Sequence, residues 1–272
     1  MKRVILFYTF LLLNMSCNKI FYHPDQVIYS NPADLNLTHE FSTIKTADSQ
    51  SLHILKIIAK QERGIVIQFH GNAQNLSSHH LSVAWMTYHG FSVYAFDYRG
   101  YGQSSGKPTR KGLVLDGQAM IQYVCSQGKK PVFMVGQSIG GAVAIPALAL
   151  KKNACVKGLI LDSTFSSYRS VAFQKLKSNL ITYFLARPLS YLISDEYSPI
   201  DYVNELNIPI MMLHSLEDPI VPLQEGKALF EHIHYNDKEF VSVHRPGHIA
   251  SFSDPRDPYR KKALDFFIRH SN

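Results

Sequence analysis

Short apolar runs alternate with longer helical segments along most of this chain. A strand that is apolar throughout needs cover on both faces, and a mostly parallel sheet between two layers of helices provides it. The sequence therefore predicts an α/β fold. The expected strands are residues 52–58, 64–69, 91–96, 132–135, 158–161, 209–213 and 239–243, and the expected helices are 76–89, 113–126, 139–150, 223–232 and 258–269.

Length and composition fit one globular domain. The chain has 272 residues, enough for a single large core, and we assign residues 41–270 to the domain. Hydrophobic residues make up 46% and charged residues 18%, which excludes a disordered chain. The net charge of +7 fits either a solvated basic surface or attraction to an anionic membrane surface or an acidic substrate. No dense Lys/Arg block is present, so a nucleic-acid partner is not expected.

The N-terminus carries an export pattern. Lys2 and Arg3 precede an apolar run over residues 4–13, which is the length of a signal peptide. A small residue then precedes Cys17, as in a bacterial lipobox, although Asn14 stands where leucine is usual. We expect residues 1–17 to be a signal peptide with a degenerate lipobox and 18–40 to be a tether or edge segment. The expected protein is exported and anchored to the membrane as a lipoprotein; plain export or a signal anchor over the apolar run is the next alternative, and a cytosolic protein the last.

The remaining cysteines, Cys125 and Cys155, do not suggest a disulfide framework. Each is expected to be a small buried hydrophobic residue, the common fate of a free cysteine. No cluster of cysteine and histidine has zinc-ligand spacing, and no metal or organic cofactor is implied.

One interval interrupts the alternation of strands and helices. Residues 163–207 contain no clear strand, but they are rich in leucine, phenylalanine and tyrosine. An insertion at this place, after a sheet strand, can form a lid over the strand ends. It can equally supply one or two extra core helices, and the sequence leaves both alternatives open.

A G-x-S-x-G motif stands at residues 136–140, between an apolar run and a run of small residues. These flanks predict a strand that turns sharply into a helix. A serine on such a turn holds its hydroxyl exposed above the sheet edge, where it can attack a substrate. The sequence therefore predicts that Ser138 is the nucleophile of a hydrolase.

A serine nucleophile needs a histidine base and an acid, and on a fold of this kind they follow the serine in the order acid, then histidine. His248 lies in a loop after the last predicted strand, and His244 at that strand's end is its rival. Asp218 follows the preceding strand and is the preferred acid over the adjacent Glu217. Asp162, at the end of an earlier strand, is an alternative acid.

The oxyanion of an acyl-transfer reaction also needs donors. The backbone N–H of Ile139, directly after the serine, is one expected donor. The turn over residues 69–75 follows an early strand and leads into a helix, so it can supply the second. We assign that role to the N–H of Asn72, with Ala73 as the fallback.

With these residues placed, the chain resembles the α/β-hydrolase superfamily over residues 41–269. It is most similar to a branch with H-G-N-A after one strand and D-Y-R-G-Y-G-x-S after the next, here residues 70–73 and 97–104. That branch includes depalmitoylase-like, membrane-associated hydrolases. The family's H-G-x-x-D-x-x-V-P acid motif matches residues 214–222, with Ser215 in place of glycine. This match supports Asp218 over Asp162, and it implies that Asp97 and Arg99 fix the loop beside the site.

The expected activity is cleavage of an ester or thioester through an acyl-enzyme, on a lipid or another acyl-chain substrate. A serine peptidase of the same fold is one alternative. A non-catalytic binding protein of this fold is another, and its usual sign would be a missing member of the triad.

Overall fold

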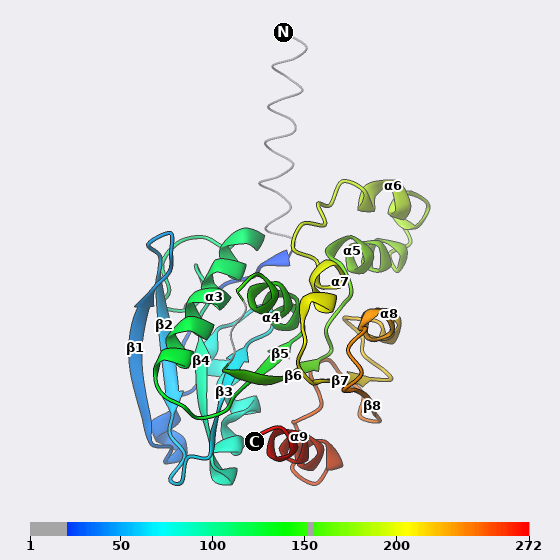
Figure 1. The fold of residues 1–272 in the computed structure, drawn as a ribbon. Helices are drawn as coiled ribbons and strands as arrows, with labels where there is room; N and C mark the ends of the chain where they lie inside the picture. Colours follow the sequence, from blue (N-terminus) through cyan, green and yellow to red (C-terminus); the bar gives the residue numbers. More distant parts are fainter. Residues whose placement is uncertain (1–20, 152–154, 272) are drawn as a thin grey trace.

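The computed structural model describes residues 21–151 and 155–271, and its centre is one mixed sheet (Figure 1). Within that part of the chain the sheet has eight strands in the order β1-β2-β4-β3-β5-β6-β7-β8. The strands are β1 (His39–Lys45), β2 (Ser51–Ile57), β3 (Gly64–Phe69), β4 (Phe91–Phe96), β5 (Val132–Gln137), β6 (Val156–Asp162), β7 (Ile210–Ser215) and β8 (Lys238–Val243). From β4 to β8 all neighbours are parallel, while β1 and β2 are antiparallel to their neighbours. The predicted α/β-hydrolase fold is confirmed.

Helices cover both faces of the sheet, and each face has its own hydrophobic cluster. The longer helices are α3 (Arg110–Ser126), α4 (Ile139–Leu150), α5 (Tyr168–Lys177), α8 (Leu223–His232) and α9 (Pro258–Arg269). Residues of α3, α4 and α8 pack on one face, and residues of α9 pack on the other. All residues of β3, β4 and β5 are buried, as expected for strands covered on both sides.

Two local predictions were wrong. The helix expected over residues 76–89 is broken into α2 (Leu76–His79) and two 3-10 segments, η2 (His80–Ser82) and η3 (Ala84–His89). The Ser82 and Thr87 hydroxyls donate to backbone carbonyls three residues earlier, and such side-chain bonds compete with a regular helix. Strand β1 was also missed: its residues are exposed or only half-buried, so it lacks the apolar pattern that marked the other strands.

The insertion after β6 has two parts. Its ends belong to the core: Tyr168 at the start of α5 and Pro199 in α7 (Pro199–Tyr202) are buried. Its middle runs from the end of α5 through η4 (Tyr183–Leu185) to α6 (Ala186–Ser190) and exposes large apolar side chains. Figure 1 shows α6 beyond α5, away from the sheet. The segment therefore contains both extra core helices and a projecting apolar portion.

The expectation of two unpaired cysteines was also wrong. Cys125, near the end of α3, forms a disulfide with Cys155, just before β6, and their Cα atoms are 5.8 Å apart. That separation is normal for a disulfide. A spacing of 30 residues gave no hint of it, because only the packing of α3 beside the sheet brings these chain positions together.

The predicted signal peptide and Cys17 lie outside the described residues. The part of the expected tether that is described packs on the domain: Tyr22 is buried, and the carbonyl of Asp25 accepts a hydrogen bond from the N–H of Gly102. Among the helices in residues 21–151 and 155–271, none is long and apolar enough to cross a bilayer.

Candidate active site

A cavity of about 590 Å³ lies beyond the carboxyl ends of the parallel strands. We call it the Ser138 cavity. Loops after β3, β5, β6, β7 and β8 contribute to its wall, which is where open α/β sheets bind ligands. Its lining is mostly apolar and comprises Phe21, His23, Asn72, Ala73, Ser138, Ile139, Phe165, Val171, Ala172, Lys175, Leu176, Asn179, Thr182, Ile193, Ile220, Val221, His248 and Ile249.

Ser138 stands on the sharp turn between β5 and α4. Its backbone has φ 55° and ψ −119°, a left-handed conformation that non-glycine residues rarely adopt. The turn is held by hydrogen bonds: Ser138 N–H donates to the carbonyl of Asp162 at 2.8 Å, and its own carbonyl accepts from Gly141 N–H at 3.1 Å. A strained backbone conformation of this kind persists only where the surrounding structure holds it, and it is often found at functional sites.

Gly140 shows why the motif needs its second glycine. A Cβ atom at this position would collide with the carbonyl oxygen of Phe69 at the end of β3. The first turn of α4 can therefore lie against β3 only because residue 140 has no side chain. That close approach brings the Ile139 N–H and the turn after β3 to the same cavity, which both residues Ile139 and Asn72 line.

His248 and Asp218 form a hydrogen-bonded pair. The distances from His248 Nδ1 to the two Asp218 carboxylate oxygens are 2.8 and 3.0 Å. A carboxylate can only accept, so Nδ1 carries the proton and Nε2 is left as the acceptor nitrogen. The imidazole lines the Ser138 cavity, whereas the Asp218 side chain is fully buried behind it.

The surroundings of Asp218 keep it ionised. Burial raises the pKa of the Asp218 carboxyl, but His248 and two backbone N–H groups lower it more, so the pKa lies below its ordinary value. Those N–H groups belong to Ile220 and Val221 and donate to Oδ1 at 2.8 and 2.9 Å. An ionised, oriented carboxylate is what stabilises an imidazolium during proton transfer.

The turn after β3 is fixed by the side chain of Asn72. Its Oδ1 accepts hydrogen bonds from the N–H of His23, the N–H of Ala73 and the hydroxyl of Tyr101, at 3.0, 2.8 and 2.9 Å. Because the Ala73 N–H is used within the turn, it is the weaker candidate for an oxyanion donor. Ala73 has φ 60°, a second strained position on the cavity wall.

The rival residues lie elsewhere. His244 and Glu217 are exposed and do not line the Ser138 cavity. Asp162 is buried and accepts a hydrogen bond from the Ser251 hydroxyl at 2.7 Å. Burial is the main reason that the pKa of its carboxyl rises to about 6. Asp218, and not Asp162, is the carboxyl that the structure brings to His248.

The D-Y-R segment holds the adjoining loop, which agrees with what the resemblance implies. The Arg99 guanidinium forms ion pairs with Asp116 at 2.8 Å and Asp48 at 2.7 Å. Asp97 accepts a hydrogen bond from the N–H of Leu76 at 2.7 Å. Neither Asp97 nor Arg99 lines the Ser138 cavity.

Several cavity residues had no sequence signal. Phe21 and His23 come from the segment expected to be a tether, and Val171, Ala172 and Leu176 come from α5.

Glu225 in α8 also had no sequence signal. Its buried carboxylate accepts hydrogen bonds from the Ser166 hydroxyl, at 2.6 Å, and from the Ser170 hydroxyl, so it ties α8 to the start of α5. The apolar bias of residues 163–207 pointed to the insertion but not to these side chains.

Ser138 and His248 line the same cavity, and Asp218 is hydrogen-bonded to His248. A hydroxyl, an imidazole and a carboxylate gathered in this way can carry out nucleophilic acyl transfer. The N-terminus of α4 adds unpaired N–H donors and the positive end of a helix dipole beside Ser138. No group of three or more histidine, cysteine or acidic residues within the described residues could hold a metal ion.

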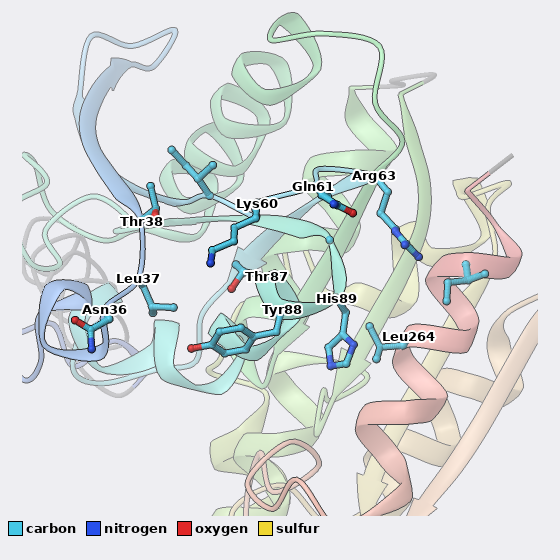
Figure 2. Close-up of a pocket in the computed structure, with 13 residues that line it drawn as sticks. Asn36, Leu37, Thr38, Lys60, Gln61, Arg63, Thr87, Tyr88, His89 and Leu264 are labelled. Atoms are coloured by element: carbon cyan, nitrogen blue, oxygen red, sulfur yellow. The ribbon is translucent and has the colours of Figure 1, made fainter.

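A second cavity of about 540 Å³ lies at the amino ends of β3 and β4 (Figure 2). We call it the Arg63 cavity. Its polar wall includes Lys60, Arg63, Tyr88 and His89, and Thr38 also lines it. None of the candidate site residues contributes to it.

Comparisons with known proteins place these observations in a family. The family model described as serine aminopeptidase, S33, matches residues 60–194, a range that includes Ser138 but neither Asp218 nor His248. The uncharacterized protein YfhR of Escherichia coli (strain K12) is 30% identical over 276 residues, which is 99% of this chain and 93% of that protein.

Two further proteins are informative. The lysophosphatidylserine lipase ABHD12 of Xenopus tropicalis is 26% identical over 233 residues, 80% of this chain and 58% of that protein. The solved structure of the esterase Pf2001 of Pyrococcus furiosus has a TM-score of 0.76 and 22% identity, covering 93% of this chain and 99% of the other. At that identity the structural match shows the fold alone.

Proposed function

The chain belongs to the α/β-hydrolase superfamily, and we propose that it is a serine hydrolase that cleaves carboxylic esters or thioesters of acyl chains. A relative that is named as a lipase supports a hydrolase. The observation that carries the finer proposal is one cavity lined by Ser138, His248, Ile139 and Asn72, with Asp218 hydrogen-bonded to His248.

In the proposed reaction, His248 Nε2 accepts the proton of the Ser138 hydroxyl as Oγ attacks the acyl carbonyl. Asp218 orients the imidazole and stabilises its charged form. The N–H groups of Ile139 and Asn72 bind the oxyanion. His248 then protonates the leaving alcohol or thiol, and water hydrolyses the acyl-enzyme by the same steps.

The cavity wall favours an acyl chain. Most of its side chains are apolar, and its volume of about 590 Å³ lies in the usual range for a small-molecule site. A serine aminopeptidase, as the family model is described, is the second candidate. An aminopeptidase must bind the charged α-amino group of its substrate, yet the described residues that line the cavity include no carboxylate. We therefore rank ester or thioester hydrolysis first.

The test is turnover of p-nitrophenyl esters by the Ser138→Ala variant. It should lose at least about 10⁴-fold in kcat, because no other group can form the acyl-enzyme. The matched control is Lys60→Ala in the Arg63 cavity, which should keep the parent rate. Undiminished hydrolysis by Ser138→Ala would remove the proposal. A peptide amide assayed beside the esters separates esterase from peptidase.

The proposed location is outside the cytoplasm, with a lipid anchor on Cys17. The Cys125–Cys155 disulfide supports this location, since such bonds persist mainly in oxidising compartments. Metabolic labelling with palmitate should mark the unaltered chain and not the Cys17→Ala variant. Absence of label in the unaltered chain would refute the anchor, and a disulfide found reduced in the isolated protein would argue against export.

A further inference from the structure

The projecting part of the insertion exposes an apolar surface. We call it the apolar tip and define it by its large side chains, which are Leu180, Ile181, Phe184, Leu185, Tyr191 and Leu192. Leu180, Ile181 and Phe184 are 90%, 89% and 89% exposed. A group of such side chains gathered in one segment marks an interaction site, because single exposed residues are common but clusters are not.

The apolar tip adjoins the mouth of the Ser138 cavity. Asn179 and Thr182 line the cavity, and Leu180 and Ile181 lie between them in the chain. On another side of the cavity, Ile220 both lines the wall and is 63% exposed. Exposed apolar side chains therefore adjoin the cavity at Leu180 and Ile181 and again at Ile220.

The charged side chains within the segment that carries the apolar tip are all basic, and Asp195 and Glu196 follow directly after it. Residues 168–193 contain Arg169, Lys175, Lys177 and Arg187 and no aspartate or glutamate. Arg169 pairs with Asp195, but the ion pairs within the described residues include none for the other three. A second copy of this surface would bring like charges together in a two-fold dimer. An anionic lipid surface would instead complement them.

The N-terminal segment reaches the same place. Phe21, the first described residue, lines the Ser138 cavity. Its ring packs edge-on against that of Tyr168 in α5, with 5.4 Å between the ring centroids. Cys17 is four residues earlier, and an extended chain of that length spans at most about 14 Å. Whether the anchor is the apolar run 4–13 or a lipid on Cys17, it would keep the cavity mouth near the bilayer.

From these observations we propose that the apolar tip inserts into the surface of an anionic membrane and that the Ser138 cavity receives its acyl chain directly from that leaflet. Amphipathic elements of this type lie in the interface with their apolar side chains below the headgroups. The proposal deepens the proposed function. Delivery of the acyl chain to the cavity rests on that function, whereas docking of the apolar tip on the membrane does not. The docking itself is tested without turnover.

The docking test uses the full chain on vesicles of phosphatidylcholine and phosphatidylglycerol with brominated acyl chains. Phe184→Trp places an indole on the apolar tip, and the matched Tyr88→Trp places one on the Arg63 cavity, where Tyr88 is 74% exposed. Trp85 is buried and present in every variant. Its fluorescence is removed by subtracting the spectrum of the unaltered protein. We expect a blue shift and bromine quenching at residue 184 and neither at residue 88.

Equal quenching at both positions, or none at residue 184, would overturn the docking. A blue shift at residue 184 in the absence of vesicles would also overturn it, because a second copy or another part of this chain would then cover the apolar tip.

The substrate part is tested with the double variant Ile181→Ser and Phe184→Ser, neither of which lines the cavity. Hydrolysis of a long-chain ester held in the vesicles should fall by at least about tenfold, the effect of 1.4 kcal/mol in binding. Hydrolysis of a water-soluble acetate ester should keep the parent rate. An unchanged rate on vesicles would refute the delivery route. If neither ester is hydrolysed even by the parent, the proposed function fails and the fluorescence result stands by itself.

Discussion

The Ser138 cavity and the Arg63 cavity have similar volumes, about 590 and about 540 Å³, but they lie at opposite ends of the parallel strands. The first has a mostly apolar wall, and the second is lined largely by polar side chains (Figure 2). Volume alone would not distinguish them. Position at the carboxyl ends of the strands, where several loops converge, does.

Backbone strain separates the two cavities further. Ala73, Ser138 and Ile249 all have positive φ on the wall of the Ser138 cavity. The positive-φ residues that line the Arg63 cavity are Asn36 and Gly90. Asparagine tolerates a positive φ, and glycine adopts it without steric strain. Each strained residue costs about 1–3 kcal/mol, so their gathering at one cavity indicates that function maintains them.

The largest expected effect concerns the acid. Asp218→Asn should lower kcat by about 10⁴-fold, because an amide can hold His248 in the wrong tautomer. Asp162→Asn should lose less than about tenfold, since its amide still accepts the Ser251 hydrogen bond, worth about 1 kcal/mol. Steady-state rates on one ester measure both. The reverse order of losses would assign the acid to Asp162.

The second prediction concerns the buried carboxyl of Asp162. The described residues that line the Arg63 cavity include no carboxyl with which to compare it. The pKa of Asp162 is about 6 in the fold against an ordinary 3.8, so the folded state binds more protons between these values. Stability should therefore fall as pH rises through that window, by up to about 3 kcal/mol.

Asp162→Asn removes this loss, so the stability of the variant relative to the parent should increase between about pH 4 and about pH 7. Urea unfolding at both pH values measures the change. A relative stability that does not depend on pH would show that Asp162 is not held protonated by its burial.

The third prediction concerns the apolar wall. Ala172→Phe fills part of the Ser138 cavity, and it should reduce kcat/KM for long-chain esters by about 10–100-fold while acetate esters are spared. Thr38→Phe makes the matched change in the Arg63 cavity and should alter neither substrate. A chain-length series of esters gives the comparison. Equal losses for short and long esters would mean that the acyl chain binds elsewhere.

The smallest effect concerns a positioning residue. Tyr101→Phe removes the hydroxyl that donates to Asn72 Oδ1, and kcat should fall about fivefold with KM unchanged, because a net hydrogen bond contributes about 1 kcal/mol. Tyr88→Phe in the Arg63 cavity is the control and should leave both constants as in the parent. A rise in KM with constant kcat would place Asn72 in ground-state binding instead.

Much of the fold could be predicted because its signals are local. Strands buried on both faces are apolar at every position, and the G-x-S-x-G turn requires small residues at fixed spacing, so β3, β4, β5 and Ser138 could be assigned from sequence. The broken helix after Asn75 could not, because its serine and threonine side chains bond to the backbone only in the folded geometry.

Long-range packing set the other limit. The Cys125–Cys155 disulfide depends on how the end of α3 meets the chain just before β6. The place of Phe21 on the cavity wall depends on how the N-terminal segment packs on the domain. Asp218 and His248 could be assigned because the order serine, acid, histidine is known for this fold. Ser138 and His248 line one cavity with Asp218 behind the histidine because β5, β7 and β8 are parallel and end on the same side.

Labelling with a fluorophosphonate tests the central claim most directly, because the probe reacts with an activated serine whatever the natural substrate is. The intact protein should take up one probe molecule, and mass spectrometry of its peptides should locate the adduct on Ser138. Ser138→Ala should remain unlabelled, while Lys60→Ala should label as the parent does. A folded parent protein that takes no label, or a label that persists in Ser138→Ala, would contradict the account.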